Sequence, residues 1–172
     1  MWVGTLIKQK HIHVVSHGPE DTRTIGRILG THAKPGDVFL LLGSLGSGKT
    51  CLTQGILWGL DSEEYARSPT FVIVLEYRGR LKMYHMDLYR LDTANEISEL
   101  GLDEYLFGDD VCVIEWADKI PDVIPKQHLI VKVDYLEETE RQLTLTDNNL
   151  QFSESLTAIK SAFKDEAHWN YL

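Results

Sequence analysis

The sequence predicts one three-layer α/β domain over residues 1–172, with a mainly parallel sheet and antiparallel hairpin additions. Three observations support this fold class. Residues 37–42 and 110–116 are short apolar runs of the kind found in strands buried on both faces. Amphipathic helical segments alternate with these runs, and two pairs of strand-like segments have the spacing of hairpins. Buried strands that alternate with helices favour a parallel sheet covered by helices on both faces.

The first third of the chain is predicted to contain strand, helix, strand and helix. Residues 11–15 (HIHVV) alternate as a strand, and residues 16–37 hold a helix in which Pro19 suits the first helical position. The Pro35-Gly36 pair ends that helix and turns the chain into the apolar run DVFLLL. The next helix has an apolar face formed by Leu52, Ile56, Leu57 and Leu60.

The remaining elements follow from the same patterns. A turn at Gly79 joins two predicted strands, Asp92 is a plausible helix cap, and "LEETE" joins the two strands of a second hairpin. The chain is expected to close with a terminal helix in residues 151–172, with Leu156, Ile159 and Phe163 on one side. The predicted segments are strands over 70–77, 81–87, 110–116, 128–135 and 141–146, and helices over 91–107 and 153–169.

Composition limits the classes of function. The formal net charge is −9, which makes the chain a poor candidate to hold a nucleic-acid backbone unaided, and we expect no DNA partner. There is no run of 18 apolar residues and no secretory leader pattern, so no membrane partner is expected. Cys51 and Cys112 lack metal-type spacing and are interpreted as reduced, buried thiols. We therefore expect a cytoplasmic protein.

The segment GSLGSGKT, residues 43–50, matches the phosphate-binding pattern G-x-x-x-x-G-K-[ST] between a predicted buried strand and a helix. Glycines allow successive backbone N–H groups to converge on phosphate oxygens, and the helix N-terminus adds partial positive charge. Lys49 is expected at the β- and γ-phosphates, and the Thr50 hydroxyl at Mg²⁺. The loop predicts a P-loop NTPase fold whose nucleotide-binding residues are Gly43, Leu45, Gly46, Ser47, Gly48, Lys49 and Thr50.

Two acids are candidates for the metal and the catalytic chemistry. Glu115 ends the buried run 111–114, and Asp87 ends the strand-like segment LKMYHMD. For each acid, a helix cap or a surface ion pair is the alternative. Thr70, in the segment RSPTF, could face the γ-phosphate. The N-K-x-D segment of GTPases is missing from the sequence, which favours ATP with Mg²⁺ as the cofactors.

Five segments occur in the order and rough spacing of the TsaE family (YjeE-like P-loop ATPases), which this sequence resembles over about residues 16–125. They are GSLGSGKT, SPTF, YHMDLYRL, ELGLDEYL and VIEWADKI. The resemblance implies an ATPase subunit of the bacterial assembly that makes threonylcarbamoyladenosine in tRNA, where it acts with TsaD-like and TsaB-like partners and meets tRNA indirectly. It implies that the protein resets or activates those partners and performs no threonylcarbamoyl chemistry itself.

The resemblance also assigns roles to individual residues. Lys49 and Thr50 take the nucleotide and Mg²⁺ roles, Glu115 takes the metal role of the family's IEW segment, and Asp87 takes the essential acid role of its DLYR segment. Thr70 falls in a switch-like loop. The turn near Pro19 and Thr22 corresponds to the part that lies along the nucleotide. Trp116 is the tryptophan that follows the acid.

The sequence departs from the family at Ser44 and Ser47, where the usual loop has aspartate and alanine. Two other functions remain open. A small-molecule kinase should carry a lid with arginines, and residues 92–125 contain none. A nucleotide-gated binding module that rarely hydrolyses ATP is the non-enzymatic alternative.

Overall fold

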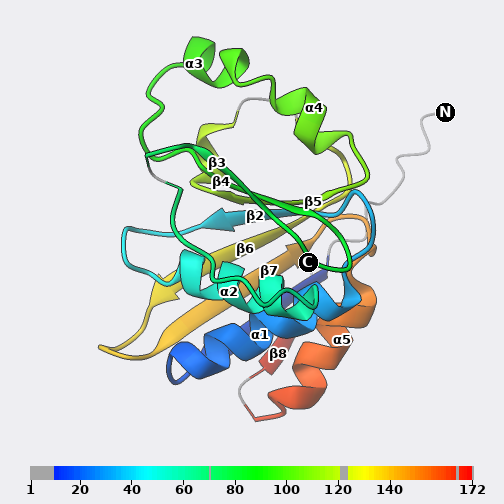
Figure 1. Ribbon diagram of the computed structural model, residues 1–172. Helices are drawn as coiled ribbons and strands as arrows, with labels where there is room; N and C mark the ends of the chain where they lie inside the picture. Colours follow the sequence, from blue (N-terminus) through cyan, green and yellow to red (C-terminus); the bar gives the residue numbers. More distant parts are fainter. Residues whose placement is uncertain (1–9, 70, 121–123, 166, 172) are drawn as a thin grey trace, which may run out of the picture.

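The computed structural model describes residues 10–69, 71–120, 124–165 and 167–171. Over these residues the strands form one eight-stranded sheet in the order β3-β4-β5-β2-β6-β7-β1-β8 (Figure 1). The strands are β1 (Lys10–Ser16), β2 (Val38–Leu42), β3 (Val74–Tyr77), β4 (Met83–Asp87), β5 (Val111–Glu115), β6 (His128–Tyr135), β7 (Arg141–Asp147) and β8 (Ala167–Tyr171). The helices are α1 (Pro19–His32), α2 (Lys49–Gly59), α3 (Ala94–Glu99), α4 (Leu102–Leu106), α5 (Ser153–Ala162) and the 3₁₀ helix η1 (Ala117–Lys119).

The parallel part of the sheet consists of β4, β5, β2 and β6. Antiparallel strands extend it on both sides, with β3 next to β4 and with β7, β1 and β8 beyond β6. This arrangement confirms the predicted fold class. Parallel strands end at the same edge of a sheet, so the segments after β2, β4 and β5 meet there.

The central strands are buried on both faces, as their continuous apolar sequences predict. Phe39 and Leu41 of β2 pack into a core beneath α1, α2 and α5, whereas Val38 and Leu40 pack into a second core beneath α3, α4 and η1. The same alternation divides β5. The sheet is therefore the middle of three layers, with α1, α2 and α5 on one face and α3 and α4 on the other (Figure 1).

Helices α1 and α2 pack closely enough to require glycine at their contact, which we call the glycine seam (Gly26 and Gly30 of α1, Gly55 and Gly59 of α2). A Cβ atom on Gly26 would lie 2.3 Å from the carbonyl oxygen of Leu52. A Cβ atom on Gly55 would lie 2.1 Å from the carbonyl oxygen of Arg23. Both distances are far inside van der Waals contact with backbone atoms that cannot easily move. The glycine seam therefore fixes how closely α1 and α2 pack against each other.

The prediction of one helix over 91–107 with Asp92 as its cap is wrong. Two short helices, α3 and α4, occupy this segment, and Gly101 interrupts them with a left-handed φ of 60°. The cap of α3 is Thr93, whose hydroxyl accepts from the backbone N–H of Glu96 while the Glu96 carboxylate accepts from that of Thr93. This capping box satisfies N–H groups that a helix start would otherwise leave unpaired.

The terminal helix predicted in residues 151–172 is correct only as far as α5. The apolar repeat of Leu156, Ile159 and Phe163 ends with that helix. Strand β8 follows and pairs antiparallel with β1. The open edge of β1 offers unpaired N–H and C=O groups, and pairing with them outweighs the local preference for helix.

Strand β3 begins later than the predicted start at residue 70. The carbonyl oxygen of Pro69 accepts hydrogen bonds from the N–H groups of Val72 and Ile73, which makes a turn where the strand was expected. Ile73 has a φ of 67°, which ends the turn before Val74 enters the sheet. No helix in the described part of the chain is long and apolar enough to cross a membrane.

Candidate nucleotide-binding site

The loop 43–50 joins β2 to α2 in a backbone conformation that depends on glycine. Gly46 and Gly48 have φ values of 75° and 111°, which side-chain-bearing residues rarely adopt, and Gly48 immediately precedes the first residue of α2. The loop therefore lies at the positive end of α2. A glycine-rich loop at a helix start can form a phosphate cradle, which is what the motif predicts.

Lys49 lies inside the loop and only 4% of it is exposed. Its Nζ donates to the carbonyl oxygens of Gly43 at 2.8 Å and Ser44 at 2.9 Å. Nζ also lies 4.3 Å from the centre of the Trp116 ring, a cation–π distance. These contacts hold the ammonium group at the centre of the cradle.

Burial lowers the pKa of Lys49, because a charge is less stable away from water. The negative charges of Glu115, Asp87 and Asp118 act in the opposite direction. A buried lysine facing acids is the electrostatic arrangement expected where a negatively charged ligand and a cation are bound together.

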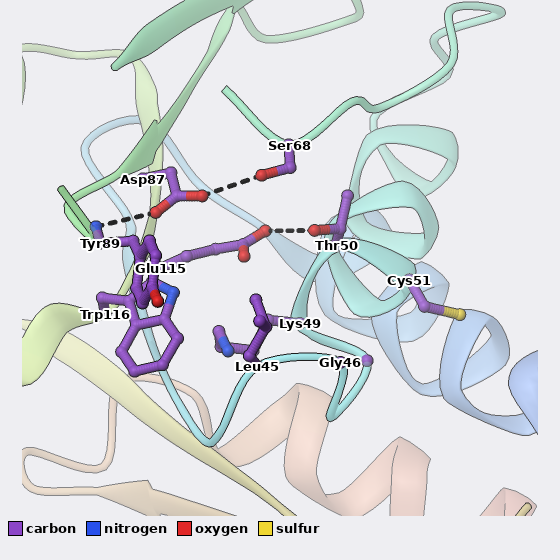
Figure 2. A pocket seen from close by; sticks show the side chains of 11 residues that line it. Leu45, Gly46, Lys49, Thr50, Cys51, Ser68, Asp87, Tyr89, Glu115 and Trp116 are labelled. Atoms are coloured by element: carbon purple, nitrogen blue, oxygen red, sulfur yellow. Dashed lines mark hydrogen bonds between the residues drawn. The ribbon is translucent and has the colours of Figure 1, made fainter. Parts of the chain in front are cut away.

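Glu115 ends β5 directly opposite the start of α2. Its Oε1 accepts a hydrogen bond from the Thr50 hydroxyl at 2.8 Å (Figure 2). The same oxygen lies 2.9 Å from Nε2 of His85, which comes from the neighbouring strand β4. Glu115 is buried, so the alternative of a surface ion pair for this acid is wrong.

Asp87 ends β4 and is the register partner of Glu115 in the parallel pair of β4 and β5. Its carboxylate accepts from the Ser68 hydroxyl at 2.8 Å and from the backbone N–H of Tyr89 at 2.9 Å (Figure 2). Asp87 is also buried, which rules out a surface ion pair. The two acids therefore lie side by side at the carboxyl edge of the sheet.

The oxygen atoms at this edge suit Mg²⁺, which prefers carboxylate and hydroxyl oxygens and usually keeps few protein ligands. Thr50, Glu115 and Asp87 supply such atoms. Two carboxylates and one hydroxyl suit an ion held by one or two carboxylates together with phosphate oxygens.

Two open cavities, each of about 280 Å³, adjoin the loop. We call them the acidic cavity and the α1 cavity. The acidic cavity, shown in Figure 2, is lined by Leu45, Gly46, Gly48, Lys49, Thr50, Cys51, Ser68, Asp87, Tyr89, Glu115 and Trp116. The α1 cavity is lined by Gly18, Pro19, Thr22, Arg23, Gly46, Ser47, Gly48, Cys51, Thr139 and Arg141. Gly46, Gly48 and Cys51 belong to both, so the two cavities flank the loop.

The cavities bring together most of the residues predicted for the site. Pro19 and Thr22, from the start of α1, line the α1 cavity with Ser47, and Cys51 donates to the carbonyl oxygen of Pro19 at 3.4 Å. Gly43 lines neither cavity, but it accepts from Lys49 and its Cα faces the carbonyl oxygen of Val133. Thr70 lies outside the described residues.

Sequence reasoning missed two contributors to the site. Arg141 of β7 donates from Nε to the carbonyl oxygen of Ser47 at 3.0 Å, and so braces the loop from the second hairpin. His85 was also missed, although its position offered a signal. It is a polar residue in an apolar strand, two residues before Asp87, and alternate strand residues face the same side.

A polar group inside the loop also fits a bound phosphate chain. The Ser47 hydroxyl is fully buried and has no hydrogen-bond partner among the described residues. Buried hydroxyls are normally paired, so an unpaired one in a phosphate cradle is a candidate donor to a ligand.

Burial raises the pKa of the Cys51 thiol, which makes this neighbour of Thr50 a poor nucleophile.

A family model and several curated proteins that are similar to this chain carry the same name, TsaE. The family model "Threonylcarbamoyl adenosine biosynthesis protein TsaE" matches residues 16–143, which extends past residue 125 into β7. The "tRNA threonylcarbamoyladenosine biosynthesis protein TsaE" of Bacillus subtilis (strain 168) is 43% identical over 129 residues, or 74% of this chain and 80% of that protein. The protein of the same name from Treponema pallidum (strain Nichols) is 36% identical over 131 residues, 76% of this chain and 97% of that protein.

A solved structure agrees with these relatives. The "Crystal structure of Bacillus subtilus YdiB" is similar to this chain with a TM-score of 0.73 and 33% sequence identity. The likeness covers 92% of this chain and 99% of that one, so it extends over the sheet and the helices on both of its faces.

Proposed function

The chain belongs to the TsaE family, and from that membership we propose that it is the ATP-binding and ATP-hydrolysing subunit of the assembly that makes threonylcarbamoyladenosine in tRNA. One observation carries the proposal. The Thr50 hydroxyl donates to Glu115 at 2.8 Å, beside the buried ammonium group of Lys49 and within the glycine-rich loop. Hydroxyl, carboxylate and lysine are the groups that a P-loop protein uses for Mg²⁺ and the β- and γ-phosphates.

Each residue of the site has a role in this proposal. Lys49 would neutralise charge on the β- and γ-phosphates, and the loop N–H groups would hold the phosphate oxygens. Thr50, Glu115 and Asp87 would hold Mg²⁺, which supplies charge neutralisation at the transferred phosphoryl group when bound. Pro19 and Thr22 would lie along the nucleoside, because the α1 cavity continues from the loop on that side.

The partners that we propose are TsaD-like and TsaB-like proteins, which hydrolysis would reset or activate. Exposed apolar side chains beside the site support a protein contact there. Phe71 is 83% exposed and Val72 61%, and the guanidinium of Arg90 lies 4.2 Å from the centre of the Phe71 ring. Leu45, at the tip of the loop, is 72% exposed. Large exposed apolar side chains are typical of an interaction surface.

The decisive measurement is ATP turnover by the purified chain, alone and with TsaD-like and TsaB-like proteins and tRNA. We expect weak turnover alone and strong stimulation by the partners, because transition-state charge often needs a group from a second protein, worth about 10³–10⁵ in rate. Rapid hydrolysis by the chain alone, without a response to the partners, would indicate an independent enzyme.

Two isosteric variants test the metal assignment within the same assay. Glu115→Gln and Asp87→Asn preserve side-chain size and remove one negative charge each from the acidic cavity. We expect each variant to lose most of its Mg²⁺-dependent turnover. We expect the free energy of unfolding to change little. Wild-type turnover by both variants would remove these acids from the metal site.

A further inference from the structure

His85 is a buried polar side chain that the proposed nucleotide chemistry leaves unexplained. It lies on β4 two residues before Asp87, and none of it is exposed. Its Nε2 is 2.9 Å from Oε1 of Glu115, and its ring lies 6.4 Å from that of Tyr77, centre to centre. A buried imidazole that contacts a candidate metal acid is placed to control that acid.

The surroundings of the ring determine which nitrogen carries the hydrogen. Nε2 faces a carboxylate oxygen, which can only accept, so Nε2 must be the donor in this hydrogen bond. Nδ1 is buried and has no hydrogen-bond partner among the described residues. A hydrogen on Nδ1 would be an unpaired buried donor, which is costly. The arrangement therefore favours a hydrogen on Nε2.

The Glu115 carboxylate is fixed by two donors at one oxygen. Oε1 accepts from the Thr50 hydroxyl at 2.8 Å and from His85, so the position of Oε1 is set from α2 and from β4 at once. Fixing one oxygen of a carboxylate also fixes the plane in which the second oxygen lies. Without His85, Glu115 could rotate while keeping its bond to Thr50.

We propose that His85 is a positioning residue that donates its Nε2–H to Glu115 and holds this carboxylate in the orientation needed for Mg²⁺. The inference rests on the proposed ATPase function, because it assigns His85 to the metal side of that site. Hydrogen-bond partners that orient a metal-binding group typically change metal affinity or activity by about 10- to 100-fold when they are removed. His85 is expected to act in that range.

The first test separates the role of the donor from a role in packing. His85→Phe removes the donor and fills the space, whereas His85→Gln places an amide N–H near the position of Nε2. ATP affinity is titrated with Mg²⁺ and with EDTA, and Mg²⁺-dependent turnover is measured in the active assembly. His85→Phe should lose about 10- to 100-fold in turnover and in the Mg²⁺-dependent gain in affinity, with unchanged affinity in EDTA. His85→Gln should recover most of that loss.

Met83→Ala is the matched control, since Met83 is fully buried on the same strand and is not a lining residue of either cavity. It should lower the melting temperature and leave the Mg²⁺ dependence of ATP binding unchanged. If His85→Phe behaves like Met83→Ala, or loses equal affinity with Mg²⁺ and with EDTA, the positioning role is overturned. If the wild-type chain itself binds no ATP, the proposed function fails first, so the two failures are distinguishable.

The wild-type protein provides a second measurement, in which a variant serves only to assign the signal. Long-range ¹H–¹⁵N spectra report which nitrogen of each imidazole carries a hydrogen, and the signal lost in His85→Gln identifies His85. A hydrogen on Nε2 supports the proposal, and an Nε2 without hydrogen overturns it. If His85→Gln does not fold, selective ¹⁵N labelling of histidine with contacts to the Tyr77 ring identifies the same signal.

Discussion

Lys49 is a charged side chain enclosed by its own loop, and its burial is balanced by backbone oxygens. A buried ammonium group is costly unless polar groups compensate it. Two carbonyl oxygens of the loop and the face of Trp116 provide that compensation. The group is thus kept charged at the place where the phosphates of a nucleotide are expected.

We predict that Lys49→Ala weakens ATP binding by about 10- to 150-fold, since charge-assisted hydrogen bonds contribute about 1.5–3 kcal/mol each. Calorimetric titration of ATP into the folded variant measures this change. Lys34→Ala is the control, because Lys34 is an exposed lysine paired with Glu154. Equal affinities of wild type and Lys49→Ala would contradict the phosphate-cradle interpretation.

Cys112 of β5 shows how burial of one thiol makes stability depend on pH. Burial, with a smaller contribution from the charge of Asp110, raises the pKa of this thiol from 9.0 to about 12. The unfolded chain therefore loses the proton near pH 9, while the folded chain keeps it. The contribution of this group to stability is complete below pH 9 and is lost as the pH rises toward 12.

We predict that wild-type protein loses about 1–2 kcal/mol more of its unfolding free energy between pH 7 and pH 10 than Cys112→Ala does. Urea unfolding at the two pH values provides both numbers. The comparison cancels every other titrating group and also the constant effect of the shorter side chain. Parallel losses in the two proteins would show that Cys112 titrates alike when folded and unfolded.

At the scale of elements, the glycine seam determines how α1 and α2 sit on the sheet. We predict that Gly55→Ala destabilises the protein by about 1–3 kcal/mol, because the new Cβ would lie 2.1 Å from the carbonyl oxygen of Arg23. The gain from replacing a helical glycine by alanine is at most about 1 kcal/mol, so the clash dominates. Urea unfolding measures the difference.

Gly18→Ala is the control for the seam. Gly18 has an extended φ of 177°, and a Cβ atom there would meet nothing within 4 Å. This substitution should leave the unfolding free energy nearly unchanged. A Gly55→Ala variant as stable as Gly18→Ala would mean that the two helices can separate without cost.

The elements also differ in how far the sequence could predict them. Strands β2 and β5 and the loop between β2 and α2 follow from apolar runs and glycine spacing, which are local signals. The break at Gly101 and the start of β3 depend on single backbone angles. Strand β8 depends on a partner strand more than 150 residues away, and no local pattern contains that information.

The residues of the candidate site also differ in how far the sequence could predict them. Lys49, Thr50, Asp87 and Glu115 could be found because each ends or begins an element with a recognisable pattern. Arg141 and His85 could not be assigned, since their roles arise only when β7 reaches the loop and β4 lies beside β5. Tertiary contacts, which a single sequence does not display, create these roles.

At the scale of the whole molecule, the net charge of −9 opposes contact with a nucleic-acid backbone. We predict that the purified chain retains no tRNA in a filter-binding assay at about 0.15 M salt, where surface charges act over about 8 Å. Retention should require the partner proteins, and the partners without this chain serve as the control. Tight binding of tRNA by the chain alone would contradict the prediction that the partner proteins bind the tRNA.

The order of the strands in the sheet has a consequence for folding during synthesis on the ribosome. Among the described strands β1 comes first in the chain, yet its two neighbours in the sheet are β7 and β8, which come last among them. At about 5–20 residues per second, synthesis leaves both edges of β1 without their partners for roughly 6–30 seconds. An unpaired strand edge is a template for association with other chains, so chaperones that bind nascent chains should matter most for this first strand. The edge of the sheet farthest from the acidic residues can close only after β8 has been made.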